Sequence, residues 1–428
     1  MQTSIISFLL LFIVTYPANV VLYLFTFNIG SEVYSAISII LIINLIIFDF
    51  SVSKYRTNKP ICNWVVVFCI LCLLGYFVNG SKTAARDSLT MLAIWFFIKL
   101  PPRLIVEVVR KYIVYHAIFL LISGLAISTW IFGFIDLDQW HVSRLSFINN
   151  NNSAVVRDNY GDFVYHMPFY LTLIPIDISN NLTSWFFGMR FSRLPFMYAE
   201  PSYTWMYTVG LFCFSIGDQN MPYRKWLLLM MFLALLLSFS VQGILSLIIA
   251  GFIGLCFSSF SLVKRNPRTF IIFLFTVILV GQIFGLNLAV LRIIGESKVE
   301  YALFLENTLS LETLTANLSL LGGDESLLTN AHVGSLSILV RYGLLGSGIL
   351  VLFWIWLIDR SIFLLSFKQV SFRMCFLPLS VLVSCFIAFR IPQINQMIPI
   401  ILLSATNYLY SEYVCAATDL ERNAITIK

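Results

Sequence analysis

Gly334-Ser-Leu-Ser-Ile-Leu-Val-Arg341-Tyr-Gly-Leu-Leu-Gly-Ser-Gly-Ile-Leu-Val-Leu-Phe-Trp-Ile-Trp-Leu-Ile358 is a long apolar stretch with a single charged residue. As a helix it would reach about 37 Å, which is enough to cross the roughly 30 Å of hydrocarbon in a bilayer. The stretch therefore predicts a transmembrane helix. It also places an arginine about two turns inside that helix.

Similar runs recur along the chain, whose 428 residues are 59% hydrophobic and only 11% charged. Run 88–98 is short and can cross only if its helix extends past the apolar core, with Arg86 and Lys99 reaching the interfaces. We predict an all-α polytopic integral membrane protein, with residues 1–428 forming a single domain of about twelve transmembrane helices. The predicted spans are 4–27, 33–50, 61–79, 88–98, 112–134, 202–217, 226–241, 243–263, 270–289, 334–358, 374–390 and 397–413.

The distribution of lysine and arginine predicts the orientation. Five of the connecting loops hold 15 Lys and Arg residues in 51 positions, whereas the five alternate loops hold 8 in 130 positions. Cytoplasmic loops carry the excess of positive charge, so both termini are expected in the cytoplasm. The basic loops are 51–60, 99–111, 218–225, 264–268 and 359–373.

Two loops on the predicted outer side, 135–201 and 290–333, are much longer than the other connections. Long loops commonly carry function, so we expect the site there. The apolar run 163–176 contains Pro168 and Pro175 and is too short to span, so it is interpreted as re-entrant or interfacial. The net charge of +6 reflects the cytoplasmic loops and gives no support to nucleic-acid binding.

The sequence contains no recognised motif for a metal or a cofactor. All eight cysteines lie in or at the ends of apolar runs, and the Cys69-to-Cys72 CxxC has no second ligand pair. His141 and His166 lack metal-ligand spacing. His116, at the inner end of span 112–134, is expected to be structural. We therefore predict neither a metal site nor a cofactor.

His332 is the first candidate for chemistry, because it lies where an acidic loop meets the long apolar run. A histidine at the membrane–water interface can act as a base near neutral pH, but it can equally anchor the helix there. Gly343 and Gly346 lie on adjacent turns, where a neighbouring backbone could approach closely. Arg341 is costly in this position unless it faces a partner or a watery cavity, so a functional or internally paired arginine is favoured.

The second candidate stretch is Arg190-Phe-Ser-Arg193-Leu-Pro-Phe-Met-Tyr-Ala-Glu200-Pro201-Ser202. Glu200 precedes a proline that suits the first turn of a helix, where the helix dipole favours an ionised carboxylate. Glu200 is therefore either a helix cap or a functional carboxylate. Arg190 and Arg193 are either solvated or ligands for an anion.

Several of these features occur in an order that resembles the bacterial O-antigen and capsule polymerases, a superfamily that also contains the O-antigen ligases. The resemblance covers roughly residues 190–350 and the pattern of about twelve spans with two dominant periplasmic loops. It is carried by Arg193 with Glu200-Pro201-Ser202, the paired-helix junction Leu237-Ser-Phe-Ser-Val-Gln-Gly243, Gly322-Gly323, and His332 with Gly343 and Gly346.

The resemblance implies a glycosyltransferase in the bacterial inner membrane that joins undecaprenyl-diphosphate-linked oligosaccharides on the periplasmic face. Arginine binds diphosphate through bidentate, charge-assisted hydrogen bonds, which assigns Arg193 and Arg292 to the leaving group. Arg190 and Arg341 are further candidates for substrate binding. An acceptor hydroxyl needs a base, and His332 and Glu200 compete for that role. A flippase and a chain-length regulator of the same pathway are the expected protein partners.

Two alternatives remain open at this point. An O-antigen ligase differs mainly in its acceptor, which is lipid A core. A flippase of lipid-linked oligosaccharides also has about twelve spans, but such carriers are usually built from repeats with short loops, and no matching halves are visible here.

Overall fold

The structure is a computed structural model that describes only part of the chain. The described residues are 2–15, 36–46, 59–79, 82–132, 134, 141–142, 165–166, 174–175, 183–186, 189–192, 194, 196–198, 201–238, 241–260, 263, 265–271, 273, 320–321, 334–366, 371–390 and 397–426.

Most of the described residues are helical, which confirms the helical class predicted from the sequence. A helical stretch also covers residues 36–46. The labelled helices are α1 (Gln2–Thr15), α4 (Lys59–Asn79), α5 (Lys82–Ile98), α6 (Pro102–Ile131), α9 (Pro201–Gly217), α10 (Arg224–Leu237), α11 (Val241–Ser259), α17 (Gly334–Leu365), α18 (Phe372–Arg390) and α19 (Met397–Thr426).

Two of the described helices are long and apolar enough to cross a bilayer, over Pro102–Thr129 in α6 and Tyr342–Leu365 in α17. Less than half of each apolar stretch is buried inside the bundle. The other residues of these stretches are partly or fully exposed. The full set of about twelve spans stays a prediction.

Several helix boundaries differ from the predicted ones. The predicted loop 99–111 was wrong, because α6 is helical from Pro102 onward. Proline is favoured at the first helical position, where its missing N–H leaves no bond unmade. The short span 88–98 belongs to α5, which begins at Lys82 as a complete crossing would require. Helix α19 continues to Thr426, well past the predicted end at residue 413.

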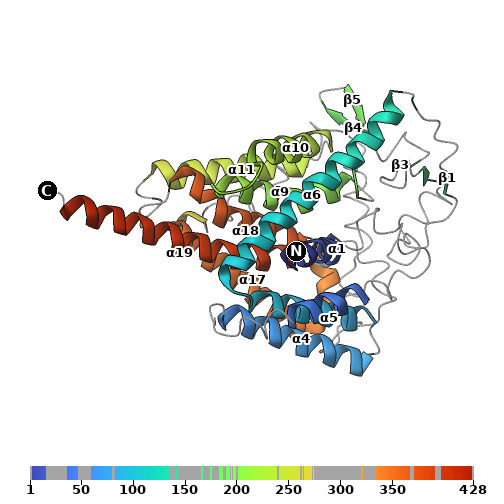
Figure 1. Cartoon of the computed structure of the whole chain (residues 1–428). Helices are drawn as coiled ribbons and strands as arrows, with labels where there is room; N and C mark the ends of the chain where they lie inside the picture. Colours follow the sequence, from blue (N-terminus) through green and yellow to red (C-terminus); the bar gives the residue numbers. More distant parts are fainter. Residues whose placement is uncertain are drawn as a thin grey trace.

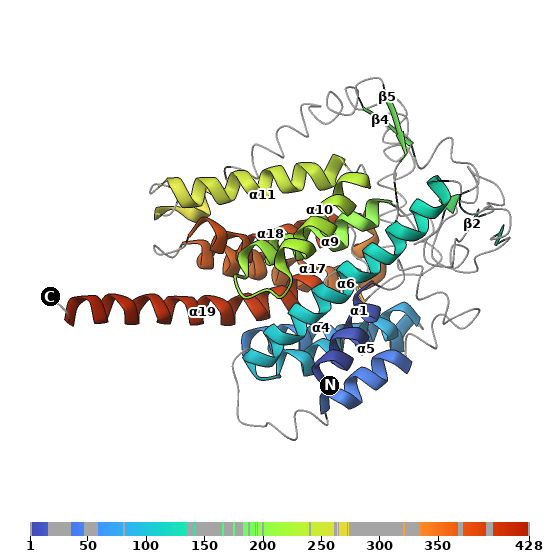
Figure 2. The ribbon, with the colours of Figure 1, turned by 45° about the horizontal axis from the view of Figure 1, so that its top comes forward.

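The helices pack with α18 in the interior of the bundle. In both views α4 and α5 lie on one side and α10 and α11 on the other, while α19 projects beyond the bundle toward the C-terminus (Figures 1 and 2). Helix α9 packs closely against α18, because two glycines allow the approach. A Cβ atom at Gly217 would lie 2.8 Å from the backbone nitrogen of Leu377, and one at Gly210 would clash with the Ser384 hydroxyl.

Five short strands lie within the predicted outer loop 135–201, where the all-α prediction made no provision for them. Strands β1, β2 and β3 form one antiparallel sheet, and β4 and β5 form a hairpin. Run 163–176 contains β2 and β3, so its described residues are extended rather than helical. The strands are β1 (His141–Val142), β2 (Tyr165–His166), β3 (Ile174–Pro175), β4 (Thr183–Phe186) and β5 (Met189–Ser192).

Ionic and polar contacts join several helices at the end of the bundle where α6 begins and α9 ends. The Arg110 guanidinium donates two hydrogen bonds to the buried Asp218 carboxylate, from Nε to Oδ2 at 2.6 Å and from Nη2 to Oδ1 at 2.8 Å. Thr3 of α1 donates to Glu107 at 2.9 Å, and Arg103 donates to the Tyr408 hydroxyl of α19 at 3.1 Å. This is the end for which the sequence predicts a cytoplasmic location.

Candidate functional site

A buried anchor, which lies in the sequence between the predicted site residues Arg193 and Glu200, packs against the middle and second half of α6. It consists of Phe196, Met197 and Tyr198, whose side chains are at most 5% exposed. Apolar burial of three consecutive side chains fixes a stretch of chain that connects strand β5 to helix α9.

The backbone of Phe196 is left-handed, with φ of 55°. Such a conformation is unusual for a bulky residue and costs on the order of 1–3 kcal/mol. It persists only where surrounding contacts determine the chain path. One such contact is on α6, where a Cβ atom at Gly124 would lie 3.2 Å from Cε1 of the Phe196 ring. The absence of a side chain at Gly124 makes room for that ring.

Tyr198 holds the anchor through a fully buried histidine on α6. Its hydroxyl lies 3.4 Å from Nδ1 of His116, and Nε2 of His116 lies 3.1 Å from the Thr208 hydroxyl on α9. A neutral imidazole donates from one nitrogen and accepts at the other, and both hydroxyl partners can take either role. The Tyr198 ring also stacks on Tyr207, with centroids 5.0 Å apart and planes within 5°. His116 is thus integral to the packing, as its buried position suggested.

A backbone hydrogen bond brings two of the sequence motifs together. The amide of Leu194, next to Arg193, donates to the carbonyl oxygen of Leu237 at 3.0 Å. Leu237 ends α10 and begins the paired-helix junction, in which the buried Ser238 hydroxyl donates to Leu235 at 2.9 Å. The first motif and the junction are therefore neighbours in space, although α9 and α10 separate them in sequence.

The third motif region contains a break in helix α17 at Gly343, where φ is 66° and ψ is −176°. Only glycine adopts this conformation readily. Just after the break, the Leu345 amide donates to the carbonyl of Leu320 at 3.2 Å. The break thus links α17 to the chain that precedes Gly322-Gly323.

The close helix approach predicted at Gly346 of α17 was wrong. Gly343 bends the chain, and a Cβ atom at Gly346 would meet the Cβ of Tyr342 in the same helix at 2.7 Å. No neighbouring helix backbone lies within 4 Å of the Cβ position at Gly346 in the described part of the structure. The local conformation of α17, rather than helix-to-helix approach, requires small residues there.

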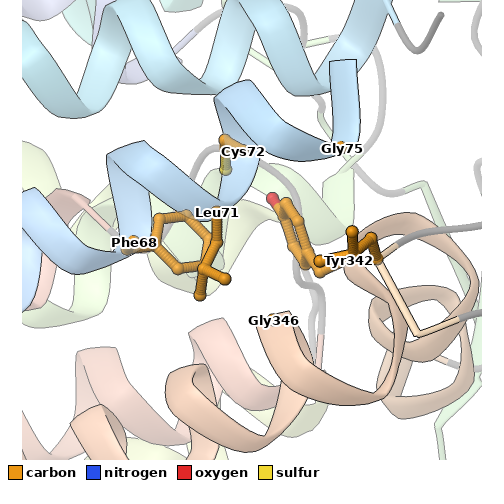
Figure 3. Close-up of a pocket in the computed structure, with 7 residues that line it drawn as sticks. Phe68, Leu71, Cys72, Gly75, Tyr342 and Gly346 are labelled. Atoms are coloured by element: carbon orange, nitrogen blue, oxygen red, sulfur yellow. The ribbon is translucent and has the colours of Figure 1, made fainter. Parts of the chain in front are cut away.

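A small apolar cavity lies beside this break, between α4 and α17 (Figure 3). Tyr342 projects from α17 toward α4, with its hydroxyl on the side of Cys72 and Gly75 (Figure 3). Its ring meets the Phe68 ring edge-on, with centroids 5.1 Å apart. The remaining lining comes from Leu71, Leu321 and Gly346. None of the described residues that line the cavity is charged.

The predicted site residues are only partly placed by the structure. Arg190 lies in β5, opposite Trp185 of β4, and Arg341 lies in α17 two residues before the break. The other four predicted site residues lie outside the described residues; they are His332, Glu200, Arg193 and Arg292. Within the described part of the chain, no group of three His, Cys, Asp or Glu side chains could hold a metal ion.

Sequence reasoning missed the anchor, although one signal pointed to it. Phe196-Met197-Tyr198 is an apolar triplet between the charged residues Arg193 and Glu200, and such a triplet favours burial. Its partner His116 lies on a distant helix, and one sequence gives no information about that pairing.

The whole chain was compared with known proteins. No family model, no curated protein and no solved structure matches it.

Proposed function

We propose that this chain is a multi-pass enzyme of the bacterial inner membrane that polymerises lipid-linked oligosaccharide repeat units on the periplasmic face. The donor is a growing glycan on undecaprenyl diphosphate, and the acceptor is another lipid-linked repeat unit. The product is O-antigen or capsular polysaccharide. The order of the sequence motifs suggests the reaction, and one contact in the structure supports it.

That contact is the hydrogen bond between the Leu194 amide and the Leu237 carbonyl. It joins the chain next to Arg193 to the paired-helix junction, so two motifs that are separate in sequence meet at one end of the bundle. A catalytic constellation requires such convergence, because its groups must be held in a fixed geometry. The hairpin of β4 and β5 leads Arg190 into the same segment.

The chemistry requires few groups. The acceptor hydroxyl attacks the anomeric carbon of the donor, the glycosidic C–O bond to the diphosphate breaks, and undecaprenyl diphosphate leaves with the bonding electrons. Arg193 and Arg292 stabilise the charge on the diphosphate through bidentate hydrogen bonds, with Arg190 and Arg341 as further ligands. His332 or Glu200 accepts the proton of the acceptor hydroxyl.

Two other functions use the same lipid-linked substrates. A ligase would transfer the finished glycan to lipid A core, and a flippase would move single repeat units across the membrane without forming a bond. The long outer loop with its anchored segment favours an enzyme over a carrier, because transporter folds are usually repeats with short connections.

Deletion of the gene in a strain that makes lipopolysaccharide distinguishes the three. Loss of a polymerase leaves the flipped single units available to the ligase, so lipid A core should carry one repeat and the long ladder should vanish. Bare core with long chains on undecaprenyl diphosphate would identify a ligase. Single lipid-linked units trapped on the cytoplasmic side would identify a flippase. Complementation with the intact gene is the control.

A further inference from the structure

We propose that His116 and Tyr198 are positioning residues that fix the 194–198 segment on helix α6. Arg193 and Glu200 flank this segment. This inference rests on the proposed function only where it gives the flanking Arg193 and Glu200 a role in the reaction. The anchoring itself can be measured without any substrate.

Neither residue can touch a substrate in this structure. His116 and Tyr198 are both fully buried, and their polar atoms face one another and Thr208 rather than a cavity. A role in the reaction must therefore act through the chain to which Tyr198 belongs. That chain reaches Arg193 in one direction and Glu200, the residue before α9, in the other.

The imidazole of His116 is the point at which three separate elements meet. It extends from α6, accepts or donates one hydrogen bond with Thr208 of α9, and forms the other with Tyr198 of the connecting segment. A buried network of this kind specifies one arrangement, because any other leaves a polar atom unpaired away from water. The arrangement it specifies is the position of Tyr198 relative to α6 and α9.

The hydrogen bond between Tyr198 and His116 is important for the 194–198 segment because of the backbone conformation of Phe196. Its left-handed backbone is held by contacts on both sides, the Leu194 amide bond to Leu237 and the Tyr198 hydroxyl bond to His116. Loss of one of these two contacts lets residues 194–198 relax toward a more common conformation. Residues 196–198 would then loosen locally while the helices remain packed.

Hydrogen exchange on the purified full-length protein in detergent tests this directly. In Tyr198→Phe, the ring and its stacking on Tyr207 are kept and only the hydroxyl is lost. We expect exchange of the amides of residues 194 and 196–198 to rise by about tenfold, which is the effect of losing one hydrogen bond. His116→Phe should give the same rise. His116→Gln should restore much of the protection, because its amide offers both a donor and an acceptor.

Tyr112→Phe is the matched control. Tyr112 is also fully buried on α6, and its hydroxyl has no hydrogen-bond partner among the described residues. Removal of this hydroxyl should leave exchange of the amides of residues 194 and 196–198 unchanged. Thr208→Val removes the other partner of His116 and should raise the exchange less than Tyr198→Phe does.

The outcomes separate the two proposals. Unchanged exchange at residues 194 and 196–198 in Tyr198→Phe overturns the anchor, whatever happens to polymer synthesis. A rise that extends equally over α6 and α9 also overturns it, because it marks general destabilisation. A local rise accompanied by a lower kcat supports the anchor and its role. A local rise in a protein whose wild type forms no polymer supports the anchor and overturns the proposed function.

Discussion

The hydroxyl of Tyr410 donates a hydrogen bond to the carbonyl oxygen of Met374, 3.2 Å away. Met374 lies four residues before Pro378, which is inside helix α18. Proline has no N–H, so the Met374 carbonyl loses its partner within the helix. Tyr410 of α19 replaces that partner, and a defect in one helix becomes a link to another.

A double-mutant cycle tests this compensation. Tyr410→Phe should lower the free energy of unfolding by about 1 kcal/mol, because a buried carbonyl is left unpaired. In a Pro378→Ala background the backbone N–H at position 378 can bond Met374, so Tyr410→Phe should cost close to nothing. Chemical unfolding in detergent measures all four variants. An equal cost of Tyr410→Phe in both backgrounds would contradict the explanation.

The break in α17 predicts opposite effects for two glycines of the same helix. Gly343→Ala should destabilise the protein by roughly 1–3 kcal/mol, because a side chain cannot easily adopt φ of 66° with ψ of −176°. Gly348→Ala should be neutral or stabilise by up to about 1 kcal/mol, because a Cβ there meets no atom within 4 Å and alanine favours helix. Thermal unfolding of both variants is the measurement. Equal effects would mean that α17 is continuous.

The sequence predicts much of the helical fold, because long apolar runs have few other stable arrangements. It predicts helix ends less well. Residues 102–111 were assigned to a basic loop between two apolar runs, whereas their charged side chains lie on α6 and bind other parts of the chain. Arg110 does so through Asp218. Charge alone does not distinguish a loop from a helix whose polar side chains find partners.

The candidate site was less predictable than the fold. Gly343 was identified correctly as unusual, but its reason is a backbone angle, which composition does not reveal. The pairs Tyr198 with His116 and Leu194 with Leu237 join residues far apart in sequence. Such contacts follow from the packing of α6, α9 and α10, and no local pattern in a single chain encodes them.

The Arg110 and Asp218 pair should contribute much more to stability than an exposed pair does. Asp218 is 0% exposed, so Arg110→Ala would leave a buried carboxylate without its cation, at a cost of roughly 3–5 kcal/mol. Arg110→Lys should recover only part of this, because lysine cannot form the two-bond fork. Unfolding in detergent is again the assay.

Arg268 and Asp359 provide the control for this comparison. Their side chains are 70% and 47% exposed, and the Arg268→Ala variant should change stability by less than about 1 kcal/mol. If Arg110→Ala proves as mild as Arg268→Ala, the Asp218 carboxylate does not depend on its arginine.

The predicted orientation can be tested by cysteine labelling. Because the basic loops are expected in the cytoplasm, cysteines introduced at Ser153 and Ser319 should react with an impermeant thiol reagent in intact spheroplasts. A cysteine at Ser53 should react only after lysis. The unmodified chain gives the background from its eight native cysteines. Labelling at Ser53 with protection at the other two positions would reverse the orientation.

The diphosphate hypothesis predicts specific losses of function at two arginines. Arg193→Ala and Arg292→Ala should each abolish chain extension in a complemented deletion strain, because the leaving group loses its cationic ligand. Lysine at either position should restore activity only partly, since a point charge replaces a bidentate fork. Arg157, in the same predicted outer loop as Arg193 but with no assigned role, supplies the matched control, and Arg157→Ala should leave the ladder of chain lengths unchanged. The ladder is read on silver-stained gels at equal protein level. Normal polymer from both Arg193→Ala and Arg292→Ala would remove these residues from the mechanism, whereas equal loss in Arg157→Ala would indicate a general need for positive charge in the loop rather than a diphosphate site.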